Sequence, residues 1–598
     1  MHRHLTRGLA ATACAAALIC PLAPGVASAG PITDAIEVYT GGAPVLSTAP
    51  NGVKITDSGF GSAFAHRSGD PDDVYYGLTD RGPNTDSDAD NEKIEPVKFQ
   101  PSIAKFRLVN GHLDPVKRIG LVTKDGTPMN GAVNPEASTG ETIVDINGKT
   151  IAPSTAGIDS EGLVVAPDGT FWVSDEYGPY VVHFDAQGHE ISRLKPFDGT
   201  LPRELAFRTP NRGMEGLTLT PDGKTLVGIM QSALETPDLT GSSKKVPFVR
   251  IVTIDVESGK TTGQYLYQLR LSEAKTSVSE ITALGNHTLL VDERDGDPGK
   301  DTFKRLYKID LSKATNINDE KSVPGATYDA EKGGLLVEGK SLEGLVSADK
   351  AAKNDETKAT EILTSHGVKP AIGELYLDVT KLVWTADPSG NTFPHDKVEG
   401  VAVTHGGATV ALSNDSDFGI NGIVKGSKNP FQLVSKHFGT DESRQDIGES
   451  LKVRMNSLPA DLRGPAYRKA EFTADGNVVN GKNLEPDTGY DVAVDGTKVG
   501  TLMTDANGSG SLDVSALAAG DHEVTLTLSL AESTVASVTV KAGPSAPTTP
   551  ITPAPSAASS SPAAPNSTAP NTTAANATAP GTSASTTHAG SGLPHTGA

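Results

Sequence analysis

The sequence predicts an all-β fold: a β-propeller of about six blades, followed by a small β-sandwich and a disordered tail. Three observations predict it. A unit made of an acidic residue, a strand, a tight turn and a second strand recurs within residues 31–439. Residues 465–542 alternate polar and apolar side chains, as half-buried strands do. The residues from 543 onwards carry no Lys, Arg, Asp or Glu.

Residues 1–29 have the pattern of a secretory signal peptide. Two arginines precede a short apolar run, and Ala27-Ser28-Ala29 is a small-residue cleavage site. The apolar run is too short for a membrane helix, and no other stretch is apolar and long enough to span a bilayer. Both cysteines of the chain lie in this segment, so we expect a secreted protein without disulfides.

The chain is acidic. Its 73 Asp and Glu residues outnumber its 52 Lys and Arg residues, which gives a formal net charge of −21. An acidic surface repels the phosphate backbone of nucleic acids, so we expect no nucleic-acid partner. We expect the chain to be a monomer.

The repeating unit of residues 30–439 begins at four glutamates, Glu161, Glu215, Glu280 and Glu399. The first two units contain Pro-Asp-Gly, a tight turn in which proline presets φ and glycine takes a positive φ. Successive units lie further apart than the roughly 40–50 residues of a four-stranded blade. The units are therefore predicted to be propeller blades with long loops.

Each unit places acidic residues at one end of a hairpin, because the glutamate begins one strand and a polar cluster ends the next. If these hairpins form the inner strands of the blades, their acidic residues converge on one mouth of the central channel. The predicted catalytic residues are Glu161, Asp175, Glu215 and Glu280. The predicted metal ligands are Asp80, Glu176, Asp292, Glu293, Glu399, Asn414 and Asp415.

Many carboxylates cannot ionise side by side without compensation, and Ca²⁺ is the natural counter-ion for oxygen ligands. The alternative is that these acidic residues form structural contacts between blades or cap strands. Basic and polar side chains lie among them in the sequence. Arginines there either pair with carboxylates or clamp a phosphate group, which a guanidinium binds in a bidentate way. The predicted substrate-binding residues are Arg81, Asn84, Tyr177, Arg212 and Arg294.

Three further segments follow the predicted propeller. Residues 440–464 have apolar residues at helical spacing and predict a helical linker. Residues 465–542 predict an Ig-like β-sandwich, in which Asp495-Gly496 and Asn507-Gly508 are hairpin turns. Residues 543–592 are rich in Pro, Ala, Ser and Thr, which predicts a disordered stalk.

The last residues, 593–598, read Leu-Pro-His-Thr-Gly-Ala. They resemble the LPxTG signal by which sortases attach surface proteins to the Gram-positive cell wall. The apolar helix and basic tail that usually follow this signal are missing. The signal is therefore either truncated or fortuitous, and we expect a truncated signal. The resemblance implies sortase and peptidoglycan as partners, and a protein that is secreted and anchored to the wall.

Several motifs across about residues 45–425 resemble the phytase-like esterase family, a β-propeller domain described as "esterase-like activity of phytase". They are Thr79–Asn84, Asp159–Leu163, Ser174–Pro179, Asn211–Leu217, and Val398–Val401 with Asn414-Asp415. The resemblance implies a phosphatase-like or phosphodiesterase-like hydrolase whose substrate is a phosphorylated small molecule or polymer. The alternative is a non-catalytic binding propeller displayed at the cell surface on a stalk.

Overall fold

The structure is a computed structural model that describes residues 32, 34–137, 140–514, 517, 520–528 and 533–542. The predicted signal peptide, stalk and sorting motif lie outside these residues. Within the described ranges, no helix is both long and apolar enough to cross a membrane.

Five four-stranded antiparallel units form the main body: three are separate sheets, and two are halves of one eight-stranded sheet; each unit is called a sheet below. The first sheet contains β4 (Ala63–Ala65), β5 (Val74–Leu78), β8 (Ser102–Val109) and β9 (His112–Gly120). The second contains β12 (Ser160–Val165), β13 (Phe171–Asp175), β14 (Tyr180–Phe184) and β15 (Glu190–Leu194). The third contains β16 (Met214–Leu219), β17 (Thr225–Met230), β18 (Phe248–Asp255) and β19 (Thr261–Gln268). The fourth contains β20 (Ser277–Ala283), β21 (Thr288–Arg294), β22 (Lys304–Asp310) and β26 (Glu374–Asp378). The fifth contains β27 (Val398–Thr404), β28 (Thr409–Asn414), β33 (Glu449–Arg454) and β1 (Ile36–Gly41).

The five sheets close into a ring. The first-named strand of each sheet packs against that of the next, and β27 of the fifth sheet packs against β4 of the first. The N-terminal strand β1 pairs antiparallel with β33 and parallel with β9, which joins the fifth sheet to the first. This is a propeller-like arrangement with five such sheets, compared with the predicted count of about six. The prediction of a mostly β fold is confirmed.

Apolar side chains fill the seams between neighbouring sheets. Leu163 of β12 packs with residues of the first sheet, while Val164, one position on, points to the other face and joins a cluster with Leu217 and Ile281. Phe64 of the first sheet packs with Ala402 of the fifth, so the closing seam is apolar as well. Each fully buried aliphatic or aromatic side chain contributes about 1.5–3 kcal/mol. The ring is therefore held mainly by hydrophobic contacts between faces of adjacent sheets.

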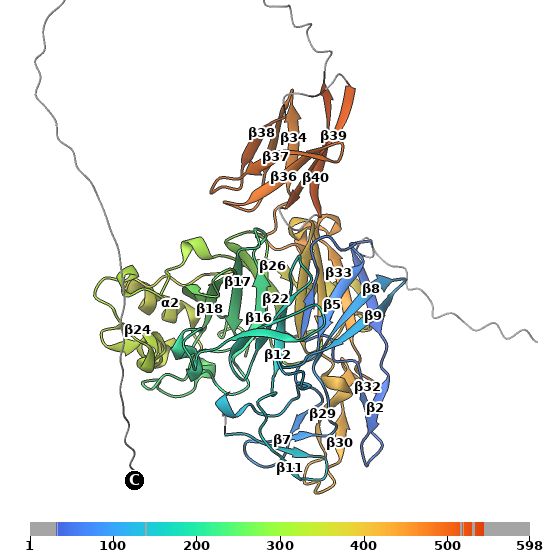
Figure 1. Ribbon diagram of the computed structural model, residues 1–598, viewed down its shortest axis with the longest axis vertical. Coiled ribbons are helices and arrows are strands. Elements are labelled where there is room, and N and C mark those ends of the chain that lie inside the picture. The colour runs from blue at the N-terminus through green and yellow to red at the C-terminus, as the bar shows by residue number, and fades with distance from the viewer. Residues whose placement is uncertain are drawn as a thin grey trace, which may run out of the picture. The chain divides into compact units, whose positions relative to one another are not determined.

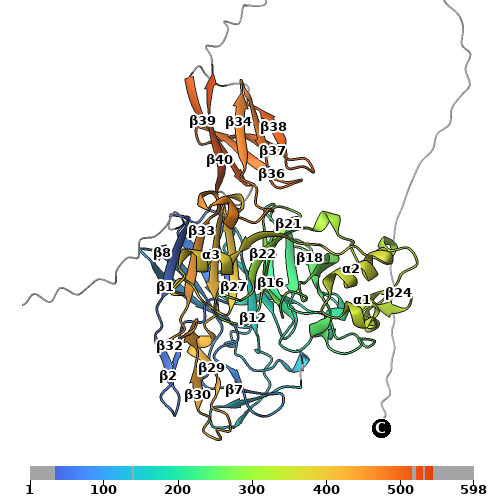
Figure 2. The same cartoon turned by 180° about the vertical axis from the view of Figure 1, so that it is seen from behind.

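Insertions between strands build structure at one end of the ring. β6 (Thr85–Asp86), β7 (Glu92–Glu95), β10 (Thr142–Asp145) and β11 (Thr150–Ile151) form one small sheet, and β29 (Ile420–Ile423) pairs with β30 (Leu433–Ser435). Two further hairpins are β2 (Val45–Thr48) with β3 (Lys54–Thr56), and β31 (His437–Phe438) with β32 (Asp441–Gln445). Figure 1 shows β7, β11, β29 and β30 grouped at the same end, and Figure 2 shows β7, β29 and β30 there from behind.

A small lobe lies between β22 and β26. It contains β23 (Thr327–Asp329), β24 (Gly334–Val337), β25 (Lys340–Ser341), α1 (Leu342–Ser347) and α2 (Glu356–Ser365), and α3 (Val379–Ala386) follows β26. A buried ion pair ties the lobe to the third sheet. The Arg250 guanidinium on β18 donates at 2.9 and 2.7 Å to the two carboxylate oxygens of Glu343 on α1. Arg250 is only 1% exposed, so this pair is inaccessible to solvent.

The helical linker predicted over residues 440–464 is wrong, because these residues form β32, β33 and two short 3₁₀ turns. β33 fills the position between β28 and β1, so hydrogen bonds to two strands override the helical spacing. The ring therefore extends beyond residue 439. Two carboxylates of this segment hold a buried histidine: His395 Nδ1 lies 2.9 Å from Asp446 Oδ1, and its Nε2 lies 3.2 Å from Glu449 Oε2.

Residues 471–542 form two sheets that share one hydrophobic core. One contains β34 (Glu471–Asp475), β35 (Val478–Lys482) and β38 (Gly510–Asp513). The other contains β36 (Gly489–Val494), β37 (Thr497–Met503), β39 (Gly520–Leu528) and β40 (Thr534–Ala542). Asp495 and Gly496 both have positive φ and connect β36 to β37, which is the turn expected of this dipeptide.

Candidate functional site

The four glutamates of the repeat lie at irregular positions in their strands. The register between the first and second strands of the sheet shifts at or beside Glu161, Glu215, Glu280 and Glu399. Such a β-bulge re-aims a side chain that regular pairing would direct elsewhere. The same position is therefore irregular in four of the five sheets, at the end of the ring where the first strands begin.

The glycine that follows three of these glutamates allows the sheets to approach each other. A Cβ added to Gly162 would lie 2.5 Å from the backbone nitrogen of Leu217 in the next sheet. At Gly216 it would lie 2.6 Å from the backbone nitrogen of Ile281, and at Gly400 2.5 Å from that of Phe64. Real Cβ atoms do not approach backbone this closely, so the Glu-Gly pair combines an acidic side chain with close packing of strands around the centre.

A strongly polar cavity of about 290 Å³ opens at this end of the ring. Its described lining contains nine carboxylates, three cations and one apolar side chain, Ile420. The carboxylates are Asp80, Asp86, Asp159, Glu161, Glu176, Glu215, Glu399, Asp415 and Asp417. The cations are Lys93, Arg294 and Lys397, and the amides are Asn84, Asn211, Gln231 and Asn421. Eight sequence-predicted site residues meet here: Asp80, Asn84, Glu161, Glu176, Glu215, Arg294, Glu399 and Asp415.

Three of these carboxylates could hold a metal ion together. One oxygen each from Asp159, Glu161 and Glu176 lies within 4.8 Å of the others. Asp159 precedes β12, Glu161 lies on β12 and Glu176 follows β13, and the Glu176 backbone N–H donates to the Asp159 carbonyl at 2.9 Å. Antiparallel pairing of β12 with β13 thus brings residues from both strand ends together.

Within the described residues, Arg81 offsets part of the charge of this triad, on the Asp159 side. Burial, and next to it the neighbouring carboxylates, raise the pKa values of Glu161 and Glu176 well above their usual range. Two ionised carboxylates at this separation repel each other by about 3 kcal/mol at an effective dielectric constant of about 20. The Glu176 Oε1 atom is buried and has no hydrogen-bond partner among the described residues. Three converging oxygen donors suit a hard divalent cation such as Ca²⁺ or Mg²⁺.

Arg81 and Tyr177 lie behind the triad and do not line the cavity. The Arg81 backbone N–H donates to Asp159 Oδ1 at 3.2 Å, and its guanidinium lies 3.9 Å from Oδ2. The guanidinium also donates to the Tyr177 hydroxyl, which in turn donates to Glu141. These two residues were predicted to bind substrate, and the structure places them where they orient Asp159.

Glu215 extends the acidic cluster away from the triad. Its Oε2 accepts a hydrogen bond from the Gln231 amide at 2.9 Å, and it shares a hydrogen bond with Glu176. Burial, with the charge of Glu399, raises the pKa of Glu215 to about 7. Glu399 pairs with the Arg294 guanidinium, which also donates to Ser279 Oγ at 2.9 Å. The cavity therefore holds a carboxyl group that titrates near neutrality beside a fixed cation.

Several other predicted residues serve the backbone. Asp175 Oδ1 accepts the N–H groups of Tyr177 and Gly178 at 2.7 and 2.8 Å and so fixes the turn after β13. Glu280 Oε1 accepts the N–H groups of Leu217 and Ile281 at 3.1 and 2.9 Å, which ties the third sheet to the fourth. Asp175 and Glu280 therefore fit the alternative interpretation, in which the acidic residues of the repeat make structural contacts.

The remaining predicted residues also lie outside the cavity lining. Glu293 pairs with Arg270 at 2.7 Å, and Asn414 Oδ1 accepts the Glu449 N–H at 2.7 Å. Arg212 is half-buried and donates to Ser277 Oγ at 3.2 Å. Asp292 is fully buried, and neither of its oxygens has a hydrogen-bond partner in the described part of the chain.

The sequence interpretation missed Asp159, Lys397, Asp86, Lys93 and Asp417 as cavity residues. Asp159 and Lys397 each lie two positions before a repeat glutamate, Glu161 and Glu399, and this shared offset is a signal that the sequence contains. The other three lie on insertions of irregular length. These residues reach the cavity because β6 contacts β29, which lies far away in the sequence. No local sequence pattern predicts such a contact.

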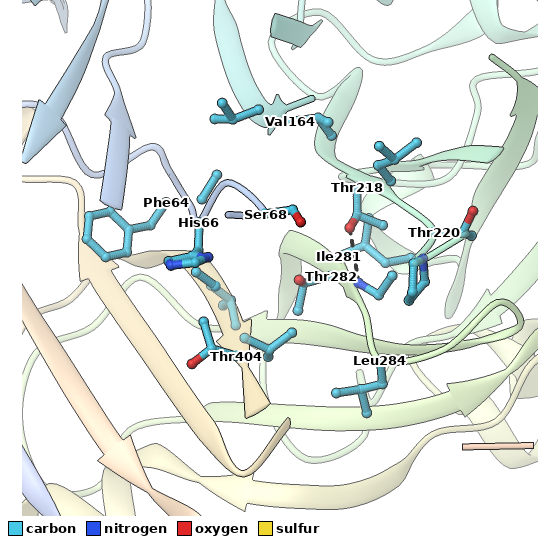
Figure 3. Close-up of a pocket in the computed structure, with 18 of the residues that line it drawn as sticks. Phe64, His66, Ser68, Val164, Thr218, Thr220, Ile281, Thr282, Leu284 and Thr404 are labelled. Carbon is cyan, nitrogen blue, oxygen red and sulfur yellow. Dashed lines mark hydrogen bonds between the residues drawn. The ribbon is translucent and has the colours of Figure 1, made fainter. Parts of the chain in front are cut away.

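A second cavity of about 150 Å³ lies at the other ends of the same inner strands. Figure 3 shows Phe64 and His66 near Thr404, with Thr218, Thr220, Ile281, Thr282 and Leu284 from the third and fourth sheets. Thr218 accepts the Ala283 N–H at 3.0 Å. The titratable residues of its described lining are His66 and Glu280; burial lowers the pKa of His66, and Glu280 already accepts two backbone hydrogen bonds. This cavity lacks the converging charges of the first.

Comparison with known proteins gives a family for much of the ring. Residues 58–351 match the family model described as phytase-like, esterase-like activity of phytase. An uncharacterized secreted protein of Arthroderma benhamiae is 28% identical over 339 residues, which cover 45% of this chain and 65% of that protein. The chain thus matches less than two thirds of that relative.

Similar solved structures include the luciferin-regenerating enzyme and the Dos1 propeller. The first has 10% identity and a TM-score of 0.26, with 68% of this chain and 94% of that chain covered. The second has 10% identity and a TM-score of 0.24, with 85% and 96% covered.

Proposed function

We propose, from the premise that residues 58–351 belong to the phytase-like family, that the polar cavity hydrolyses phosphate esters with the help of a divalent metal ion, Ca²⁺. The observation that carries the proposal is the composition of the cavity. The Asp159, Glu161 and Glu176 carboxylates converge within 4.8 Å of one another, and Arg294 and Lys397 line the same space. Phosphoryl transfer uses both parts, oxygen ligands for a metal and cations for the phosphoryl oxygens.

The triad would hold the metal. Its three metal-ligand groups are all carboxylates. Glu176 Oε1 is buried and has no hydrogen-bond partner among the described residues, so it is available to a cation. Metal binding removes the protons that burial keeps on Glu161 and Glu176. A bound divalent cation would neutralise charge on the phosphate and polarise its oxygens. Arg81 would act as a positioning residue, since it holds Asp159 through backbone and side chain.

The chain's own groups supply the proton transfers. Glu215 is the proposed general base, because its pKa of about 7 allows it to accept a proton from water at neutral pH and the Gln231 amide fixes its orientation. As water forms a bond to phosphorus, its proton passes to Glu215 and the bond from phosphorus to the ester oxygen breaks. Asp80, whose pKa burial and nearby carboxylates raise, donates a proton to the departing oxygen. Arg294 binds a phosphoryl oxygen.

We further propose that the protein acts outside the cell. The predicted signal peptide and the relative from Arthroderma benhamiae, described as secreted, support this location. Extracellular calcium sites work at about 10⁻⁴–10⁻³ M Ca²⁺, so a site of three carboxylates need not be tight. Attachment to a cell wall by the C-terminal sorting motif belongs to the same proposal.

The test is phosphate release by the full chain from a phosphomonoester and a phosphodiester, p-nitrophenyl phosphate and its bis ester. We expect turnover with Ca²⁺, loss of turnover in EDTA, and loss in the double variant Glu161→Gln/Glu176→Gln. The exposed Glu257→Gln serves as control and should behave like the parent. Turnover that survives the double substitution contradicts the mechanism. No turnover of either ester, together with tight binding of a glycan or protein, favours the display alternative.

A further inference from the structure

The cation Lys397 stands at the cavity wall formed by the fifth sheet. Its Nζ lies 2.6 Å from Asp417 Oδ1 and 3.1 Å from Asp415 Oδ2, and its side chain is 32% exposed. An ammonium group has three N–H donors. The two carboxylates account for two of them, which leaves one donor at a side chain that lines the cavity.

A second lysine fixes the carboxylate that holds Lys397. Asp417 Oδ2 lies 2.6 Å from Nζ of Lys436, which is 2% exposed. Lys436 also reaches Asp396 Oδ1 at 2.9 Å and the Asp415 carbonyl at 3.0 Å. Its three donors are therefore all engaged, and Asp417 is clamped between two ammonium groups.

The backbone that carries Asp417 is strained. Asp417 and Phe418 have φ values of 45° and 55°, in the left-handed region that residues other than glycine rarely adopt. Such a conformation is unfavourable and persists only where the surroundings of the residue hold it. Here Phe418 is buried and packs edge-to-face on Phe99, with ring centroids 4.8 Å apart. Packing thus fixes the turn that presents the Asp417 carboxylate to Lys397.

We propose that Lys397, in addition to Arg294, recognises the doubly charged tetrahedral oxyanion of a phosphoryl group, and that Asp417 and Lys436 are the positioning residues of Lys397. The inference deepens the proposed function and rests on it for the identity of the anion. Two of the three arginines expected to bind phosphate are engaged outside the cavity, Arg81 with Asp159 and Tyr177 and Arg212 with Ser277. The third, Arg294, lines the cavity and pairs with Glu399.

The same charges set a condition on anion binding. Nine carboxylates and three cations line the cavity, so a phosphoryl group is repelled until a metal ion offsets part of the negative charge. Lys397 then adds a charge-assisted hydrogen bond, which contributes about 1.5–3 kcal/mol. Loss of that bond corresponds to about a 10- to 100-fold weaker anion affinity.

The experiment measures binding without turnover. Methylphosphonate, which has no ester bond to hydrolyse, is titrated into the full chain with saturating Ca²⁺ and followed by ³¹P NMR, while calorimetry measures Ca²⁺ binding. We expect Lys397→Gln to weaken methylphosphonate binding about 10- to 100-fold and to leave Ca²⁺ binding unchanged. Lys397→Arg should recover most of the affinity, and the exposed Lys313→Gln should match the parent.

The positioning residues are tested with Asp417→Asn, which keeps the shape of the turn. We expect it to weaken methylphosphonate binding and leave Ca²⁺ binding intact, whereas a merely structural role would move neither or both. Equal methylphosphonate affinity in Lys397→Gln and the parent, or no binding by the parent with Ca²⁺ present, overturns the proposal. Lysine-dependent anion binding without hydrolysis of any phosphate ester would uphold it and reject the proposed hydrolase.

Discussion

Replacing Glu215 by glutamine in the metal-free protein should stabilise the ring at pH values above the ordinary pKa of a glutamate. At lower pH the substitution should have no such effect. Burial and the charge of Glu399 raise the pKa of Glu215 from 4.5 to about 7. The folded state therefore holds a proton that the unfolded state releases, so stability falls as pH rises between these two values. A shift of this size corresponds to roughly 3 kcal/mol. Glutamine, which never ionises, escapes this cost.

The assay is urea unfolding of the full chain in EDTA, followed by tryptophan fluorescence at pH 4.5 and pH 8. Both tryptophans of the chain, Trp172 on β13 and Trp384 on α3, lie in the ring, so the signal reports the ring alone. We expect Glu215→Gln to match the parent at pH 4.5, where the parent carboxyl is protonated. At pH 8 the variant should be more stable by about 3 kcal/mol.

Two comparisons make the result decisive. The exposed Glu257→Gln should show no pH-dependent difference from the parent. Saturating Ca²⁺ should remove much of the difference at pH 8, because the metal offsets the negative charge that raises the pKa of Glu215. A stability difference of equal size at both pH values would refute the reasoning, since it would point to packing rather than ionisation.

Three other measurements test the same physical picture. Ca²⁺ should bind more tightly at pH 8 than at pH 5.5 and should release protons on binding, because Glu161 and Glu176 have raised pKa values. Calorimetry in two buffers of different ionisation enthalpy measures the proton release. A Ca²⁺ affinity that does not change with pH contradicts the prediction. Two carboxylates raise the pKa of His395 to about 9, so this residue should add on the order of 3 kcal/mol to the free energy of unfolding below pH 6.5. This contribution should be lost as pH rises through 9. Urea unfolding at pH 6 and pH 10 should show the loss, and His395→Gln should abolish the difference. Arg250→Met should lower the free energy of unfolding by about 3–5 kcal/mol, because it leaves Glu343 buried and unpaired. The double variant Arg250→Met/Glu343→Leu should recover most of this stability. A single variant that melts like the parent contradicts this expectation.

The sequence allowed the position of the site to be predicted because one local pattern recurs. Glutamate at the start of a strand, followed in three units by glycine, marks a bulge where neighbouring strands approach closely. Strand alternation and turn chemistry then place these glutamates at one end of each hairpin. Both features are local, so they can be read without knowing which strands pair over long distances.

The number of sheets and the anion-binding residues depend on long-range contacts. The predicted count of about six lies above the observed five because insertions such as the lobe before β26 lengthen the chain without adding a sheet to the ring. The fifth sheet also takes β1 from the N-terminus and β33 from the segment predicted to be helical. Likewise, nothing in the sequence around Arg81 reveals that Asp159 and Tyr177 engage its guanidinium.

The glutamate position of the repeat has two different roles in this ring. Glu280 accepts backbone hydrogen bonds, whereas the other three repeat glutamates line the polar cavity. Gly216, in the preceding sheet, leaves room for the Glu280 carboxylate, which lies 2.6 Å from where a Cβ on that glycine would be. The carboxylate accepts two backbone N–H groups there, and isoleucine rather than glycine follows it. Glu161 accepts no such backbone hydrogen bond among those the structure shows and stays at the cavity. Equivalent positions around the ring therefore divide into one glutamate that holds two sheets together through backbone hydrogen bonds and three that line the polar cavity.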